Sequence, residues 1–271
     1  MEVCDSQIVY PSRLTVYRFY FLGDIHWGSR QCDEAEADKT LKSIAANPFA
    51  RVLLMGDLCE YISANDWRHE PDLIADWVNQ NDTCRCQEEY AVSKLAPIKN
   101  KIIGAIQGNH EHTIERDGNL QTHDHLCQAL GITNLGYSAF VHFTFIRRKE
   151  HTRGGFQRGL TIYIHHGYGG PRTMGGDANR FSEMMRDYDA DWFVSGHTHK
   201  RYAVPSIQYI VNRENRLDTR HRMYGRSGTF LRGVDEGKTA SYAERAGMPA
   251  LGTGALVIDY SPFYNEAIAK I

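Results

Sequence analysis

The stretch Asp191-Trp-Phe-Val-Ser-Gly-His-Thr-His199 joins a short apolar run to two histidines. An apolar run of this length that ends at a glycine is typical of a buried strand followed by a turn. His197 and His199 therefore lie where the chain leaves the strand. Two imidazoles at such a position indicate a metal site, but a chain with 13 histidines can carry one such pair by chance. A metal site at His197 and His199 therefore requires further candidate ligands elsewhere in the chain.

The same pattern, an apolar run followed by a turn with Asp, Asn or His, occurs four more times upstream. The four segments are residues 19–26, 53–57, 102–111 and 162–167. Active sites of open α/β sheets collect at the carboxyl ends of strands, so we expect these turns to converge. The candidate metal ligands in the five segments are Asp24, His26, Asp57, Asn109, His165, His166, His197 and His199.

Length and composition favour one domain over residues 1–271. A chain of 271 residues with 42% hydrophobic residues can bury a sizeable core, and the five segments must meet in one place. The 31 basic and 33 acidic residues give a formal net charge of −2. This balance does not favour a nucleic-acid partner, although a local basic patch would still allow one.

The sequence also predicts a cytoplasmic location. The six cysteines are scattered without a CxxC pair, which is typical of reduced intracellular thiols. The first residues lack a basic segment followed by an apolar one, and no run of about 18 apolar residues is present. We therefore expect no membrane association.

Periodicity predicts alternating strands and helices, followed by a second sheet. We expect strands at 15–22, 51–55 and 101–107 and helices at 33–46, 88–99 and 122–130. Residues 140–146 and 160–164 alternate with period two, which indicates an antiparallel hairpin. A helix at 179–188 and strands at 191–194, 201–211, 221–230 and 255–260 should follow. The segment 60–85 has no clear pattern and can form a local cap near the site.

Two further segments have open interpretations. Residues 167–176 contain five glycines and form either a linker or a substrate-side loop, in which Arg172 and Arg180 would meet an anion. The second segment is a basic stretch that we expect to be the solvated face of a hairpin rather than a nucleic-acid surface. Its members are Arg213, Arg216, Arg220, His221, Arg222 and Arg226.

The candidate ligands are too many for one ion. Tetrahedral and octahedral sites use four to six donors including water, so two adjacent ions that share one carboxylate are the economical interpretation. A mixed set of imidazole, carboxylate and amide donors suits Mn²⁺, Fe or Zn²⁺. Two ions about 3.5–4 Å apart hold the attacking and leaving oxygens of an in-line displacement and activate a bridging water. This chemistry is hydrolysis at phosphorus, so we expect a phosphate-ester substrate.

The five segments, in this order, resemble the motifs of the calcineurin-like metallophosphoesterase superfamily over residues 15–200. The resemblance implies an α/β fold, a four-layer αββα sandwich of two mixed β-sheets flanked by helices, with a dinuclear centre at the strand ends. It also implies that His110 protonates the leaving group or steadies the phosphate. The first ion would take Asp24, His26 and His199, the second would take Asn109, His165 or His166, and His197, and Asp57 would bridge them.

The adjacent His165 and His166 depart from the single strand-end histidine that is usual in this superfamily. Neighbouring residues on a strand face opposite sides, so only one can be a ligand unless the strand has already ended. A His-x-Gly alignment selects His165 and a His-Gly alignment selects His166. We favour His165 and retain His166 as the alternative.

The resemblance implies a metal-dependent hydrolase of phosphate esters, with manganese as the favoured ion. We expect a phosphodiesterase, because Gly56-Asp57 continues as Leu58-Cys59-Glu60 and not as the Asp-Arg-Gly block of protein phosphatases. The alternatives are a DNA or RNA nuclease of the same superfamily and a non-catalytic metal-binding scaffold. The glycine-rich loop and residues 241–247 are also similar to small phage and prophage phosphoesterases.

Overall fold

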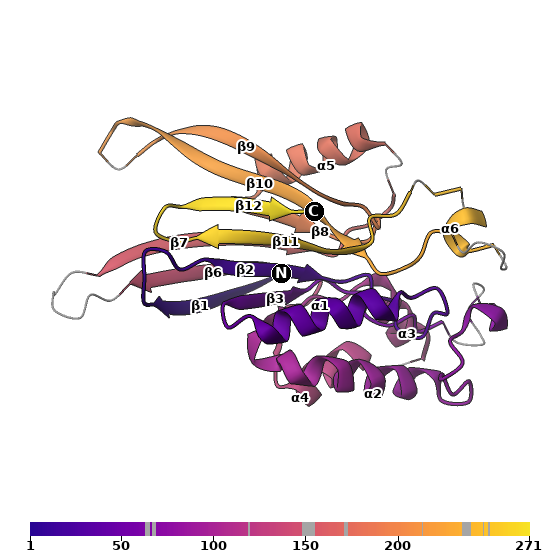
Figure 1. The fold of residues 1–271 in the computed structure, drawn as a ribbon. Coiled ribbons are helices and arrows are strands. Elements are labelled where there is room, and N and C mark those ends of the chain that lie inside the picture. Colours follow the sequence, from indigo (N-terminus) through magenta and orange to yellow (C-terminus); the bar gives the residue numbers. More distant parts are fainter. Residues whose placement is uncertain are drawn as a thin grey trace.

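A computed structural model describes residues 1–62, 66, 69–118, 120–147, 155–170, 173–212, 214–234, 240–245, 247–248 and 250–271 (Figure 1). The α-helices are α1 (Glu34–Ala46), α2 (Thr83–Leu95), α3 (Asn109–Gly118), α4 (Thr122–Leu130), α5 (Met174–Asp187) and α6 (Tyr242–Arg245). Short 3-10 turns lie at η1 (Pro71–Leu73) and η2 (Ala96–Lys101). None of the helices in these ranges is long and apolar enough to span a membrane.

The strands form one hydrogen-bonded path that mixes parallel and antiparallel pairs. They are β1 (Glu2–Tyr10), β2 (Tyr17–Leu22), β3 (Ala50–Leu54), β4 (Ile102–Ala105), β5 (Thr133–Asn134), β6 (Ser138–Arg147), β7 (Phe156–His165), β8 (Trp192–Ser195), β9 (Arg201–Val211), β10 (Leu217–Thr229), β11 (Gly254–Ser261) and β12 (Glu266–Lys270). Their order is β1-β6-β7-β8-β10-β11-β2-β3-β4-β5, with β9 on β10 and β12 on β11. The expected mixed α/β class is confirmed.

The junction between β10 and β11, in the middle of the path, is narrow, because only Gly228↔Ala255 and Thr229↔Gly254 pair there. On one side of this junction β2, β3 and β4 run parallel to one another, and on the other side β7, β8 and β10 do so. The large sheet therefore curls, and α1, α2 and α4 lie on one side of the molecule while α5 lies on the other (Figure 1).

Side chains of β2 alternate between two apolar clusters, because both faces of this strand are covered. Phe19 belongs to the cluster inside the curled sheet, where its ring lies 5.1 Å from that of Phe143 and 5.4 Å from that of Trp192. Tyr20 and Leu22 belong to the cluster shared with α1, α2 and α4. The carboxyl end of β2 is thus fixed from both faces, which gives the following turn a rigid base.

Helix ends follow the local sequence signals. The Asp33 carboxylate accepts a hydrogen bond from Glu36 N at 3.0 Å and caps α1, and α4 ends at Gly131, whose φ of 66° suits glycine. Thr173 caps α5, so this helix begins earlier than the expected residue 179. The end of the glycine-rich segment is therefore helical rather than a loop.

The expected hairpin is confirmed, since β6 and β7 pair antiparallel from Ser138↔His165 to Arg147↔Phe156. Two strands were not predicted from the sequence, namely β1, which pairs parallel with β6, and β12, which pairs antiparallel with β11. Both are edge strands with several exposed positions, so their composition lacks the dense apolar run of β2.

The basic stretch on β10 is not a solvated face at Arg222 and Arg226, which are only 7% and 2% exposed. Arg222 donates hydrogen bonds to the backbone oxygens of Ala190, Met185 and Tyr188. Arg220 binds the carboxylates of Asp189 and Asp191. The expectation of solvated side chains is wrong for these arginines, because β10 lies between β9 and β8 along this stretch rather than at an edge.

Candidate metal centre

Backbone hydrogen bonds bring the first two turns together. Asp24 N donates to Gly56 O at 2.9 Å, and Ile25 N donates to Asp57 O at 2.9 Å. These bonds continue the parallel pairing of β2 with β3 beyond the ends of the two strands. Asp24 and Asp57 are consequently neighbours, with 0% and 1% of their surfaces exposed.

The turns carry an unusual backbone conformation at the candidate ligands. Among the described residues, five of the eight non-glycine residues with positive φ are candidate ligands. Left-handed backbone costs free energy in side-chain-bearing residues and clusters at functional sites, where surrounding contacts hold it. The five are Asp24 (48°), His26 (57°), Asp57 (50°), His197 (70°) and His199 (56°).

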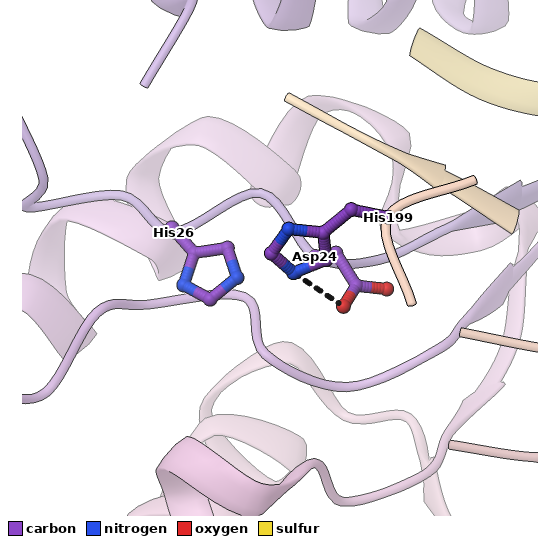
Figure 2. A group of neighbouring side chains, drawn as sticks. All are labelled: Asp24, His26 and His199. Carbon is purple, nitrogen blue, oxygen red and sulfur yellow. Dashed lines mark ion pairs between the residues drawn. The ribbon is translucent and has the colours of Figure 1, made fainter. Parts of the chain in front are cut away.

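One group of side chains consists of Asp24, His26 and His199 (Figure 2). His199 Nε2 lies 3.4 Å from Asp24 Oδ1, and the rings of His26 and His199 are 5.2 Å apart. His26 Nε2 is buried and has no hydrogen-bond partner among the described residues. A buried imidazole nitrogen without a partner is costly, and a cation bound between these three side chains would satisfy it.

A second group consists of Asp57, His166 and His197, with Asn109 beside it. His166 Nε2 lies 3.2 Å from Asp57 Oδ2 and 3.1 Å from Asn109 Oδ1. His166 Nδ1 donates to Met55 O at 2.7 Å, so a neutral ring directs the Nε2 lone pair at two oxygen acceptors. Only a proton or a cation makes that arrangement favourable, and the group therefore fits a metal ion.

The two groups are in direct contact. His197 N donates to both carboxylate oxygens of Asp24, at 3.0 and 3.1 Å, although the His197 ring belongs to the other group. Gly196 makes this approach possible, because a Cβ there would lie 2.6 Å from Asp24 Oδ2. The two groups of side chains thus form one continuous cluster.

His165 lies outside this cluster. Its Nδ1 accepts a hydrogen bond from Gly167 N at 2.7 Å, and its side chain lines a cavity of about 180 Å³ against α5. The strand β7 ends at His165, so the chain has left the strand at His166, which is 3% exposed. The structure thus places His166, and not the favoured His165, beside Asp57 and His197.

Burial and neighbouring charged side chains set the pKa values of the cluster. Burial alone would raise the pKa of the Asp57 carboxyl, but the positive charges of His166 and His110 hold it well below its usual range. Burial alone would lower the pKa of His166, but the Asp57 carboxylate raises it to about 10. For His197, burial and then the charge of His166 lower the pKa to about 4. Buried carboxylates that stay ionised attract cations.

His110 lies next to the first group. Its ring centroid is 4.7 Å from that of His26, and its backbone N donates to Asp57 Oδ1 at 2.8 Å. Its Nδ1 lies 2.5 Å from the backbone oxygen of Glu60 and donates to it. The Glu60 carboxylate in turn lies 2.8 Å from His26 Nδ1. Glu60 is not among the predicted site residues, although a carboxylate three residues after Asp57 in a strand-end loop is a usable signal.

Glu111 holds the backbone of the turns at Asp57 and Gly108 through hydrogen bonds. Its carboxylate accepts hydrogen bonds from the backbone N–H groups of Asp57, Leu58 and Gly108 at 2.8–2.9 Å. Burial and then the nearby Asp57 raise the pKa of Glu111 to about 7. Glu111 follows Asn109 and His110 in its segment, but nothing in the sequence pattern indicates this backbone-holding role.

The two arginines predicted to meet an anion, Arg172 and Arg180, differ in what the structure describes. Arg172 lies outside the described residues. Arg180 stacks over the Tyr168 ring, 4.7 Å from its centroid, and donates to the Tyr168 backbone oxygen. Arg180, which lies in α5, thus contacts Tyr168 of the loop through both its ring and its backbone oxygen.

A model of the family described as calcineurin-like phosphoesterase matches residues 17–201. No curated protein matches the chain. The solved structures that resemble it include a conserved, predicted phosphoesterase from Streptococcus pneumoniae TIGR4, with 8% identity, a TM-score of 0.36 and coverage of 95% of this chain and 99% of that one.

Two other solved structures are similar to the chain. The metallophosphoesterase from Sphaerobacter thermophilus has 12% identity, a TM-score of 0.40 and coverage of 94% and 87%. GAP50, the anchor in the inner membrane complex of Plasmodium, has 12% identity, a TM-score of 0.48 and coverage of 94% and 84%.

Proposed function

The chain belongs to the calcineurin-like phosphoesterase family, and we propose that this metal-dependent hydrolase is a phosphodiesterase with a dinuclear centre. The observation that carries the proposal is the contact between two groups of side chains that can each hold an ion. Asp24, His26 and His199 form one group, and Asp57, His166 and His197 form the other. A four-layer αββα arrangement and a cytoplasmic location remain part of this proposal.

In the proposed site, Asp57 is shared between the ions and Asn109 adds an amide oxygen to the second group. This donor set suits Mn²⁺ first, with Fe or Zn²⁺ as alternatives. When bound, two such ions would supply Lewis-acid polarisation of the phosphate ester and an activated water at neutral pH. The remaining tasks, which are to orient the phosphate and to protonate the leaving oxygen, belong to protein side chains.

His110 is the proposed proton donor to the leaving oxygen. The carbonyl of Glu60 accepts a hydrogen bond from its Nδ1–H, which fixes the orientation of the ring, and Nε2 is the proposed proton-transferring nitrogen. The hydrogen bond from His110 N to Asp57 Oδ1 keeps the residue beside the shared carboxylate. General acid catalysis requires this kind of fixed ring within reach of the reacting atoms.

The charge around the site favours a diester over a monoester. The Glu60 carboxylate lies 2.8 Å from His26 Nδ1 and adds negative charge next to the buried Asp24 and Asp57. A phosphodiester carries one negative charge, whereas a monoester carries almost two at neutral pH. Additional carboxylate charge therefore penalises the monoester more.

A nuclease is disfavoured because the central arginines of the basic stretch are paired with carboxylates or buried. Arg220 is paired with two aspartates, and Arg222 and Arg226 are buried. Affinity for a nucleic-acid backbone needs accessible clustered cations. We therefore favour a small diester as the substrate.

The test compares substrates on protein reconstituted with Mn²⁺. Bis-p-nitrophenyl phosphate, p-nitrophenyl phosphate and single-stranded DNA are assayed side by side, with Asp57→Asn as the inactive control. We expect kcat/KM for the diester to exceed that for the monoester by about tenfold or more, which is about 1.4 kcal/mol of transition-state discrimination. Faster hydrolysis of the monoester would contradict the diesterase assignment, and preferential cleavage of DNA would replace it with a nuclease.

A further inference from the structure

Asp177 is a fully buried carboxylate in the first turn of α5, with 0% of its surface exposed. It accepts hydrogen bonds from Lys200 Nζ and from Arg226 Nη2, both at 2.7 Å. The two cations are nearly removed from solvent, with side-chain exposures of 12% and 3%. A desolvated carboxylate between two cations is held in place strongly.

The two partners of Asp177 lie at opposite ends of the turn that carries His197 and His199. Lys200 directly follows His199 in the chain. Arg226 also donates through Nη1 to Ser195 Oγ at 2.9 Å and to Gly196 O at 3.0 Å, just before His197. One carboxylate on α5 thus ties down both ends of the turn.

This turn requires external support. His197 and His199 have φ values of 70° and 56°, which non-glycine residues keep only when their surroundings enforce them. Gly196 packs against Asp24 so closely that small movements of the turn change the distances between Asp24 and both histidines. A contact that fixes the turn therefore fixes the geometry of both centres.

The helix that carries Asp177 is itself well anchored. Thr173 caps its amino end through a hydrogen bond from Gly176 N at 3.2 Å. Phe181 packs in a cluster with Phe193 of β8, and the Arg226 guanidinium stacks over the Phe181 ring at 5.0 Å. The carboxylate is thus presented from a rigid element.

We propose that Asp177 is a positioning residue for metal binding, which acts through Arg226 and Lys200 on the turn of His197 and His199. The inference rests on the proposed function only in taking these two histidines as ligands. Removal of residues that orient metal ligands costs about 10–100-fold in metal affinity. An ion pair that served only folding would leave the affinity for the metal unchanged.

The experiment measures Mn²⁺ affinity of the full chain by isothermal titration calorimetry, for wild type and Asp177→Asn. The substitution keeps the shape of the side chain and removes its charge. We expect about 10–100-fold weaker Mn²⁺ binding, with hydrolysis partly restored by excess Mn²⁺. Circular dichroism and thermal melts establish that the variant is folded.

The matched control is Asp259→Asn, which breaks the 2.6 Å pair with Arg18 between β2 and β11. Arg18 lies at the start of β2, whereas the candidate centre lies beyond its end. We expect this variant to lose thermal stability and to keep wild-type Mn²⁺ affinity. An equal loss of affinity in Asp259→Asn would overturn the inference, because it would show a general effect of instability.

A second variant covers the case in which Asp177→Asn does not fold. Lys200→Gln removes one cation and leaves a neutral Asp177–Arg226 pair, and we expect about tenfold weaker Mn²⁺ binding. Wild-type affinity in either folded variant would overturn the positioning role. Wild-type protein that binds Mn²⁺ without hydrolysing any phosphoester would overturn the proposed function and leave this inference standing.

Discussion

His166 Nε2 lies 3.2 Å from Asp57 Oδ2, and both side chains are almost completely buried. The other ring nitrogen of His166 is occupied by the backbone oxygen of Met55. The pair therefore directs Nε2 of the ring and one carboxylate oxygen into the same small space. A divalent cation in that space explains both the burial of the carboxylate and the orientation of the ring.

Replacement of the two adjacent histidines should have opposite outcomes. We expect His166→Ala to lower Mn²⁺ affinity and kcat/KM by more than about 100-fold, because loss of a ligand exceeds the usual cost of losing a residue that orients one. His165→Ala should stay within about threefold of wild type in both quantities, since its Nδ1 is used by Gly167. Metal titration and diester hydrolysis check both variants. The reverse outcome would restore His165 as the ligand.

Local sequence patterns were enough to locate most of the candidate cluster. The turns at Asp24, Asp57 and His197 follow dense apolar strands, and parallel strands deliver such turns to one edge of a sheet. The sequence pattern could not distinguish His165 from His166, because the choice depends on the residue at which β7 stops pairing with its neighbours.

Long-range charge pairs could not be predicted in the same way. Arg226 was interpreted as part of a solvated basic stretch, and its partner Asp177 is distant in the sequence. No period or motif connects the two, and burial of charged groups becomes visible only when both partners are placed. Glu60 was missed for a related reason, since it lies at the start of a polar segment without periodicity.

Mn²⁺ binding should release a proton from His166. Burial alone would lower its pKa, but Asp57 raises the pKa to about 10, whereas the unfolded value is about 6.5. The raised pKa stabilises the metal-free fold fully below about pH 6.5, and this contribution is lost as the pH rises through about 10. Because the ligand form of histidine is neutral, metal competes with this proton.

We therefore expect Mn²⁺ affinity to rise about tenfold per pH unit between pH 6.5 and 8.5, with about one proton released per ion at this group. Calorimetry in buffers of different ionisation enthalpy measures the released protons, and His166→Gln supplies the control. Affinity that is independent of pH in wild type would contradict the protonated state of His166 in the metal-free protein.

His110→Ala should separate proton transfer from metal binding. We expect both ions to remain bound and kcat to fall by about 10²–10⁴, the usual contribution of general acid–base catalysis. The loss should be largest for alkoxide leaving groups and smallest for p-nitrophenolate, which leaves without a proton. Equal losses on the two kinds of leaving group, or loss of the ions, would remove His110 as the general acid.

Glu60→Gln should weaken the site through His26. The carboxylate orients the His26 ring and increases its basicity through Nδ1, so we expect about 10–100-fold weaker Mn²⁺ binding. Glu89→Gln, at an exposed pair with Arg85 on α2, is the control and should behave like wild type. Comparable metal affinity in both variants would show that Glu60 does not orient the ligand.

A stepwise Mn²⁺ titration of chelator-stripped protein, with bound metal per chain and diester hydrolysis measured on the same samples, tests the dinuclear mechanism most sharply. We expect no hydrolysis without metal, binding that reaches two ions per chain, and activity that develops as the second ion binds. For Asp57→Asn we expect weaker binding of both ions and little turnover, because an amide supplies no negative charge to hold two cations close together. Full hydrolysis by the metal-free protein, or saturation of activity at one ion per chain, would contradict the dinuclear mechanism.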